Sequence, residues 1–127
     1  MKHKTPKILI VEDDAFLLSI YERRFVMDGF EVLTVKDGET ALSLAPKSLP
    51  DCVLLDILLP KLDGMTVLER LKRDITTQNI PVLLLTNLGQ KTDRAKGMAL
   101  GAADYMIKAH FRPSEVVKRV REIIGLE

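Results

Sequence analysis

Three short, continuous apolar runs limit the folds open to this chain more than any other feature. They lie at Lys7–Val11, Asp51–Leu55 and Pro81–Leu85, and each is far shorter than the roughly 20 residues that a membrane helix needs. A strand that is apolar throughout is expected where both of its faces are covered, as in a parallel sheet between layers of helices. The three runs therefore predict an α/β protein.

Amphipathic segments alternate with these runs along the whole sequence. Phe30–Val35 and Ala103–Ile107 add two further strands. Apolar residues at helical spacing predict five helices, at Ala15–Met27, Glu39–Ala45, Met65–Arg73, Lys91–Leu100 and Pro113–Ile124. Pro46 is expected to end the second helix, whereas Pro113 suits the first turn of the last one. Alternation of this kind predicts a three-layer sandwich of five parallel strands and five helices.

Composition narrows the class of protein further. The 127 residues suit a single domain spanning 1–127, and 46% hydrophobic with 29% charged residues is typical of a globular chain. The basic start Met1–Lys4 is followed by too short an apolar run for a secretory signal, so a cytoplasmic location is expected. A single cysteine, Cys52, excludes an internal disulfide and is expected in the core. The net charge of +1 gives no argument for nucleic-acid binding.

Polar side chains stand directly after the predicted strands. In a doubly wound sheet, ligands bind just beyond the carboxyl ends of the strands, and right-handed crossovers bring those ends to one edge. The residues at these positions are Glu12, Asp13 and Asp14 after the first strand, Asp56 after the third, Thr86 after the fourth and Lys108 after the fifth. We expect them to share one site.

This set of side chains has a coherent chemistry. Clustered carboxylates repel one another, and their burial is costly unless a cation compensates them. Mg²⁺ suits a site with few carboxylates because it keeps several waters and accepts phosphate oxygens. A carboxylate such as Asp56 can act as a nucleophile and form an acyl phosphate. Thr86 and Lys108 would then supply a hydroxyl donor and a cation for the phosphoryl charge.

Each residue taken alone has an ordinary structural explanation. Asp13 or Asp14 would serve well as the N-cap of the following helix. Asp56 could be a buried carboxylate held by hydrogen bonds, Thr86 a hydroxyl bonded to backbone, and Lys108 a solvated surface cation. Only their combination at strand ends favours a phosphoryl site.

Longer fragments of the sequence resemble response-regulator receiver domains over nearly the full length. The matching pieces are Ile8–Asp14, Leu54–Pro60, Asp63-Gly64, Pro81–Thr86, Gly101–Tyr105 and Lys108. The resemblance implies a flavodoxin-like, doubly wound five-stranded parallel sheet in the order 2-1-3-4-5. It also implies a phosphorylation-activated signalling switch, and not an enzyme acting on an external substrate.

The resemblance assigns a role to each site residue. Glu12 and Asp13 would hold Mg²⁺, with Asp13 a direct ligand. Asp56 would be both the phosphoacceptor and a metal ligand, and the backbone carbonyl of Leu58 would be the remaining protein ligand. Thr86 and Lys108 would contact the phosphoryl group, and Tyr105 would be the aromatic switch, with plain core filling as the alternative for this tyrosine.

Partners follow from the same resemblance. A histidine kinase or a phosphotransfer protein would supply the phosphoryl group. The face formed by residues 91–100, 103–107 and 113–124 would then control binding of a downstream protein or a phosphorylation-enhanced homodimer. This face carries many charges, which can equally be a solvated surface; they are Lys91, Arg94, Lys96, Asp104, Glu115, Lys118, Arg119 and Arg121. Direct contact with nucleic acid or membrane is not expected.

The sequence departs from the family pattern at several positions. Ala109 replaces the proline that commonly follows the lysine, so a cis peptide bond is not expected there. Asn87 replaces a small residue and is expected to restrict inward movement of Tyr105. Leu58 and Leu88 occupy the two positions that usually tune loss of the phosphoryl group. Neither can position a water, so we predict slow self-dephosphorylation.

Two other functions fit parts of the pattern. A phosphatase with an aspartate nucleophile usually needs a second acid two residues later, and Leu58 stands there. A degenerate receiver would bind partners without being phosphorylated, but every acid, hydroxyl and lysine position is filled.

Overall fold

The structure is a computed structural model that describes residues 5–126. The basic residues Met1–Lys4, rejected above as the start of a secretory signal, lie outside the described residues, as does the last residue of the predicted domain. Among residues 5–126, none of the helices combines the length and the apolar character that crossing a membrane requires.

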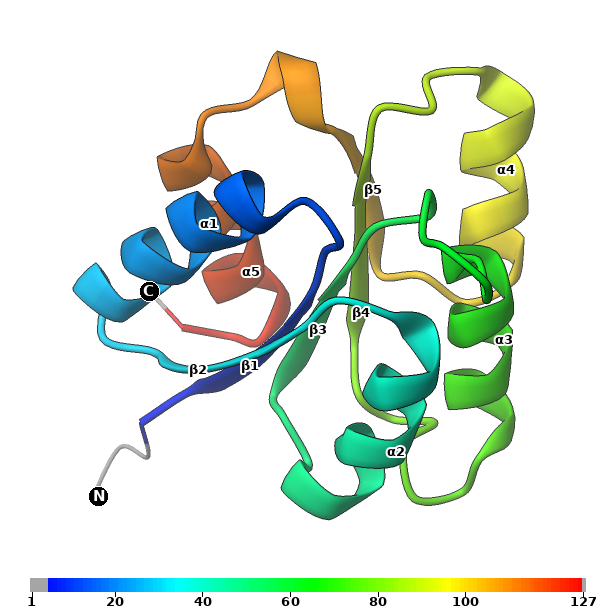
Figure 1. The fold of residues 1–127 in the computed structure, drawn as a ribbon, viewed down its shortest axis with the longest axis horizontal. Helices are drawn as coiled ribbons and strands as arrows, with labels where there is room; N and C mark the ends of the chain where they lie inside the picture. Colours follow the sequence, from blue (N-terminus) through cyan, green and yellow to red (C-terminus); the bar gives the residue numbers. More distant parts are fainter. Residues whose placement is uncertain (1–4, 127) are drawn as a thin grey trace.

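Five parallel strands form one sheet at the centre of the molecule (Figure 1). They are β1 (Lys7–Val11), β2 (Glu31–Val35), β3 (Cys52–Leu55), β4 (Val82–Thr86) and β5 (Asp104–Ile107). The strands lie in the order β2-β1-β3-β4-β5. The predicted α/β class and strand order are therefore confirmed.

Helices cover both faces of this sheet (Figure 1). One face is covered by α1 (Ala15–Met27) and α5 (Pro113–Ile123), and the other by α2 (Gly38–Ser48), α3 (Gly64–Arg73) and α4 (Lys91–Ala99). Alternate residues of β1 serve the two layers, because successive side chains of a strand point to opposite faces. Ile8 and Ile10 pack with the α1 and α5 core, whereas Leu9 and Val11 pack with the α2 and α3 core.

Predicted and observed boundaries agree within one residue except at the C-terminus of α2. The prediction that Pro46 ends this helix is wrong, because α2 continues to Ser48. The last turn keeps other hydrogen bonds: the backbone N–H of Leu49 donates to the Ala45 carbonyl, and the Ser48 hydroxyl donates to the Leu44 carbonyl. Ala45 is fully buried against the sheet, and this packing favours continuation of the helix past the proline.

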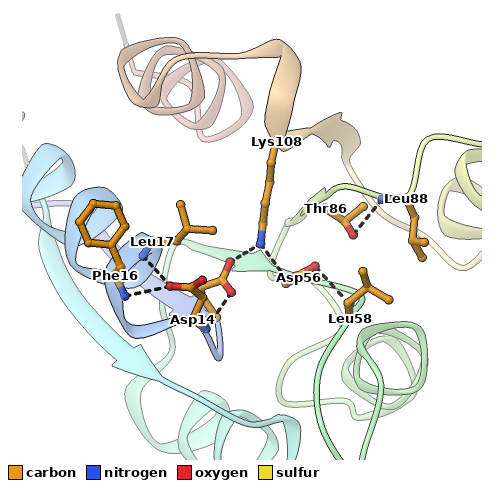
Figure 2. Close-up of polar contacts among 9 residues, drawn as sticks. Asp14, Phe16, Leu17, Asp56, Leu58, Thr86, Leu88 and Lys108 are labelled. Carbon is orange, nitrogen blue, oxygen red and sulfur yellow. Dashed lines mark hydrogen bonds and ion pairs between the residues drawn. The ribbon is translucent and has the colours of Figure 1, made fainter.

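Two smaller predictions are confirmed. Cys52 lies in the core beside α1 and α5, where burial raises the pKa of its thiol to about 12. The segment after β5 forms a short 3₁₀ turn, Lys108–His110, and its peptide bonds are trans. With Ala109 in place of proline, this turn directs the Lys108 side chain toward the ends of β1 and β3 (Figure 2).

Candidate functional site

The three predicted metal-binding acids meet at the carboxyl edge of the sheet. Glu12 follows β1 and Asp56 follows β3, and their side chains are buried, with exposed fractions of 3% and 5%. Asp13 is exposed beside them. One carboxylate oxygen from each of the three lies within 4.8 Å of the others. The parallel sheet thus brings these residues, which are distant in sequence, together at one edge, as predicted from their positions after the strands.

Lys108 forms ion pairs with both buried acids, and Figure 2 shows its ammonium beside Asp56. Its ammonium donates to Asp56 Oδ2 at 2.8 Å and also forms an ion pair with Glu12 Oε1. Burial raises the pKa of Glu12, and the hydrogen bond from Lys108 offsets part of that effect. Burial lowers the pKa of Lys108, but the bonds to Asp56 and Glu12 outweigh it, so the pKa is raised. The ammonium therefore stays charged and compensates the acids.

Backbone groups fix the remaining oxygens of the acids. The Leu58 N–H donates to Asp56 Oδ1 at 3.1 Å, and the Asp14 N–H donates to Glu12 Oε2 at 3.1 Å. Gly64, the first residue of α3, allows the backbone to approach Asp56 closely, since a Cβ there would lie 2.2 Å from the Asp56 carbonyl oxygen. The acids are held by the fold as well as by Lys108.

Asp14 and Asp13 have different roles: Asp14 caps a helix and Asp13 belongs to the acidic cluster. Asp14 caps α1, because its Oδ1 accepts from the backbone N–H groups of Phe16 and Leu17 at 2.9 and 3.1 Å (Figure 2). This resolves which of the two acids caps the helix and leaves Asp13 facing the cluster of carboxylates. The loop that carries Leu58 exposes the leucine side chain.

Thr86 and Tyr105 lie on the other side of Asp56. Thr86 ends β4 with its side chain fully buried, and its Oγ1 accepts a long 3.4 Å hydrogen bond from the Leu88 N–H. Tyr105 is also buried, and its hydroxyl donates to the Leu88 carbonyl at 2.5 Å. Asn87 is exposed. The expectation that Asn87 restricts inward movement of Tyr105 is therefore wrong, because Tyr105 is already buried while Asn87 is exposed.

The comparison with known families decides the identity of this arrangement. Residues 8–121 match the response regulator receiver domain. The chain belongs to that family. This receiver has curated relatives that are transcriptional regulators: it is 43% identical to the probable transcriptional regulator ycf27 of Guillardia theta and 42% identical to the regulator RpaA of Synechocystis. These matches cover 93% and 94% of the receiver but 45% and 49% of the relatives, so it spans about half their length.

Solved structures show the same fold. A putative response regulator from Chloroflexus aurantiacus has a TM-score of 0.89 and 37% identity, with 96% of this receiver and 99% of that chain covered. The receiver domain of sensor histidine kinase PA1611 from Pseudomonas aeruginosa has a TM-score of 0.87 and 28% identity, with the same coverage. In the latter structure a magnesium ion is coordinated in the active-site cleft. The acidic cluster of the present receiver has the donor atoms to hold a metal ion.

One ionic group of this receiver is not evident from the sequence. Asp104 of β5 pairs with Arg119 of α5 at 2.7 Å and with Arg94 of α4 at 3.5 Å, and it also accepts from the Tyr105 N–H. Arg94 additionally donates to the Tyr105 carbonyl at 2.8 Å. Part of the charged face that was considered for docking is therefore paired within the chain. The sequence placed Asp104 on the same predicted face as these arginines, but it could not show which charges pair, because α4, β5 and α5 are separate in sequence.

Proposed function

We propose that this receiver accepts a phosphoryl group on Asp56 in a Mg²⁺-dependent reaction and acts as a switch. The observation that carries the proposal is the meeting of three carboxylates with the Lys108 ammonium at the carboxyl edge of the sheet, next to the buried Thr86 hydroxyl. Structural ion pairs alone do not account for a third, exposed acid, Asp13, beside two acids that are already paired.

The donor set fits Mg²⁺. The cluster offers only oxygen donors, which this hard cation prefers, and a cation that keeps several waters suits so few protein ligands. Asp13 and Asp56 would be direct ligands, with Glu12 and the Leu58 backbone carbonyl completing the protein contribution. When bound, the ion would neutralise charge on the phosphoryl oxygens.

The protein's own groups account for the transfer. An Asp56 carboxylate oxygen would attack the phosphorus of a phosphohistidine on a histidine kinase or a phosphotransfer protein. The new P–O bond replaces the P–N bond, and the leaving imidazole takes up a proton. Lys108 would exchange its contact with Asp56 Oδ2 for one with a phosphoryl oxygen, and the Thr86 hydroxyl would donate to another.

A surface beside Asp56 suits the protein that presents the phosphohistidine. Phe16, in the first turn of α1, has an exposed fraction of 73% and lies beside Asp14, the N-cap of that helix (Figure 2). Ile20 and Met27 follow it at helical spacing on the accessible side of α1 and line a groove against Pro113 and Ser114 of α5. Arg23 and Arg24 also line this groove. Exposed apolar side chains bordered by cations favour docking of the phosphodonor protein here.

The downstream partner of the switch, its oligomeric state and its cellular location stay predictions. The chain would act as a single receiver domain, residues 1–127, whose α4, β5 and α5 face controls an unidentified downstream protein. A phosphorylation-enhanced homodimer through this face, the absence of direct nucleic-acid contact and a cytoplasmic location likewise rest on the sequence.

Intact-mass measurement after incubation with Mg²⁺ and acetyl phosphate tests the proposal. We expect a gain of one phosphoryl group in the wild type and none in Asp56→Asn. Hydrolysis of acetyl phosphate without accumulation would instead indicate a phosphatase. No change in mass, together with intact folding, would indicate a degenerate receiver.

A further inference from the structure

A buried glycine in α4 stands against the ring of Tyr105. Within α4, all of which is described, Gly97 is the one buried residue. Glycine inside a helix is less stable than alanine by roughly 0.5–1 kcal/mol, so its presence here calls for a packing reason. A Cβ at this position would lie 2.6 Å from Leu84 Cδ1 and 3.3 Å from Tyr105 Cδ2. The Leu84 and Tyr105 side chains thus occupy the space that a methyl group at position 97 would need.

Neither neighbour can yield freely. Leu84 is fully buried, and it faces Tyr105 in the register between β4 and β5. Arg94, one turn earlier in α4, ties the helix to β5 through its bond to the Tyr105 carbonyl. The helix is thus fastened next to the ring, so an added methyl would press on the Tyr105 side chain directly and through Leu84.

The Tyr105 ring in turn holds the loop after β4. The Tyr105 hydroxyl donates to the Leu88 carbonyl, and the Leu88 N–H donates to Thr86 Oγ1. Leu88 therefore joins the tyrosine to the hydroxyl beside Asp56 (Figure 2 shows the Thr86 and Leu88 end of this path). These bonds are present while Lys108 still contacts Asp56.

We propose that Gly97 is a positioning residue that keeps Tyr105 buried, so that residues 86–88 are ordered for the phosphoryl group before it arrives. A loop that is already ordered loses less conformational entropy when a ligand binds, so its affinity for that ligand is higher. The part of this inference that concerns phosphoryl binding rests on the function proposed above. The part that concerns the loop does not.

Hydrogen exchange of the unphosphorylated protein tests the loop. Gly97→Ala is expected to speed exchange of the Leu88 amide and its neighbours about five-fold, the equivalent of one net hydrogen bond. Tyr105→Phe keeps the ring and adds no methyl group to α4, but it removes the hydroxyl that donates to Leu88. It should speed exchange of the Leu88 amide by the same factor. Both changes remove the same contact, the hydrogen bond from Tyr105 to Leu88, so the double variant should exchange no faster than either single variant. Ala95→Gly, on the exposed side of α4, perturbs the helix without touching the ring and should leave the loop unchanged.

Binding of beryllofluoride with saturating Mg²⁺ tests the second part. Gly97→Ala and Tyr105→Phe should each weaken it about five-fold, again without additivity. Unchanged exchange in Gly97→Ala, or additive effects in the double variant, overturns the positioning role. Faster exchange with wild-type beryllofluoride affinity overturns the link to the phosphoryl group. A wild type that binds no beryllofluoride and accepts no phosphoryl group overturns the proposed function and that link together, while exchange still decides the role of Gly97.

Discussion

Asp56 lies between the Lys108 ammonium and the Thr86 hydroxyl, and these two groups are held by contacts of very different strength. On the first side, Lys108 forms two ion pairs, with Asp56 and Glu12, among side chains that are almost fully buried. On the second side, the Thr86 hydroxyl accepts a long hydrogen bond from the Leu88 N–H. The Lys108 ammonium is fixed by ion pairs without any ligand. The loop on the other side is held by the bond from Tyr105 to Leu88, but the Thr86 hydroxyl itself has only a weak contact.

This difference separates stability from signalling. A buried ion pair leaves an uncompensated charge when one partner is removed, so changes at Lys108 should affect the resting protein. A 3.4 Å hydrogen bond is near the limit of such contacts and contributes little. Changes at Thr86 should therefore have little effect on the free energy of unfolding of the resting protein and a larger effect on binding of the phosphoryl group.

The largest expected effect comes from the residue shared by both sides. Asp56→Asn should abolish phosphorylation by acetyl phosphate completely, because an amide cannot act as the nucleophile. The asparagine oxygen can still accept from Leu58 or Lys108, so cooperative thermal unfolding should be retained. Phosphoryl incorporation in this variant, measured by intact mass, would place the phosphoacceptor elsewhere.

Asp13→Ala should remove the response to metal on the acidic side. We expect loss of the Mg²⁺-dependent rise in thermal stability and of Mg²⁺-dependent phosphorylation, because Asp13 is the exposed acid not engaged by Lys108. Asp14→Ala is the matched control. It should cost about 1 kcal/mol through loss of the helix cap yet keep the metal response. Equal metal responses in wild type and Asp13→Ala would exclude this residue as a ligand.

Lys108→Met should act in opposite directions on two measurements. Chemical denaturation is expected to show a loss of up to about 3 kcal/mol, since Glu12 and Asp56 lose their cation. Mg²⁺ should bind more tightly, because the ammonium no longer competes for the same oxygens, while phosphorylation falls. Lys96→Met, on the exposed surface of α4, is the control for loss of one positive charge. Unchanged Mg²⁺ affinity in Lys108→Met would contradict the competition.

Thr86→Val should leave the resting protein nearly unchanged. The free energy of unfolding without phosphate is expected to change by less than about 1 kcal/mol, the scale of a weak hydrogen bond. Beryllofluoride affinity should fall about ten-fold or more, because a charged acceptor loses its hydroxyl donor. A large loss of resting stability would mean that the two sides of Asp56 do not differ as described.

The smallest effect is expected at the two leucines beside the site. Leu58→Asn with Leu88→Glu should speed loss of the phosphoryl group about ten-fold, less than a complete general base provides. The polar side chains can position a water that leucine cannot. Leu58→Met with Leu88→Met keeps the apolar character and should retain the wild-type rate. An unchanged rate in the polar variant would show that hydrolysis is controlled by other groups.

Strand ends were predictable because each strand carries its own local pattern. The apolar runs specify β1, β3 and β4, and the parallel arrangement brings Glu12, Asp56, Thr86 and Lys108 to one edge without knowledge of any contact. The end of α2 was not predictable from Pro46, because burial of Ala45 outweighs the local preference. Sequence spacing could not show that Lys108 bonds to Glu12, 96 residues earlier, or that Gly97 faces Tyr105, since these contacts depend on how the layers pack.

The ion pair between Glu12 and Lys108 has a consequence for the growing chain. A ribosome releases the acids of β1 and β3 long before it completes β5, and until then the two carboxylates have no lysine. Closing the sheet early would bury them without a cation, which is unfavourable. A product that stops before residue 108 should therefore stay open to proteases and chaperones. Compensated burial of Glu12 and Asp56 is therefore expected only after Lys108 has been added to the chain.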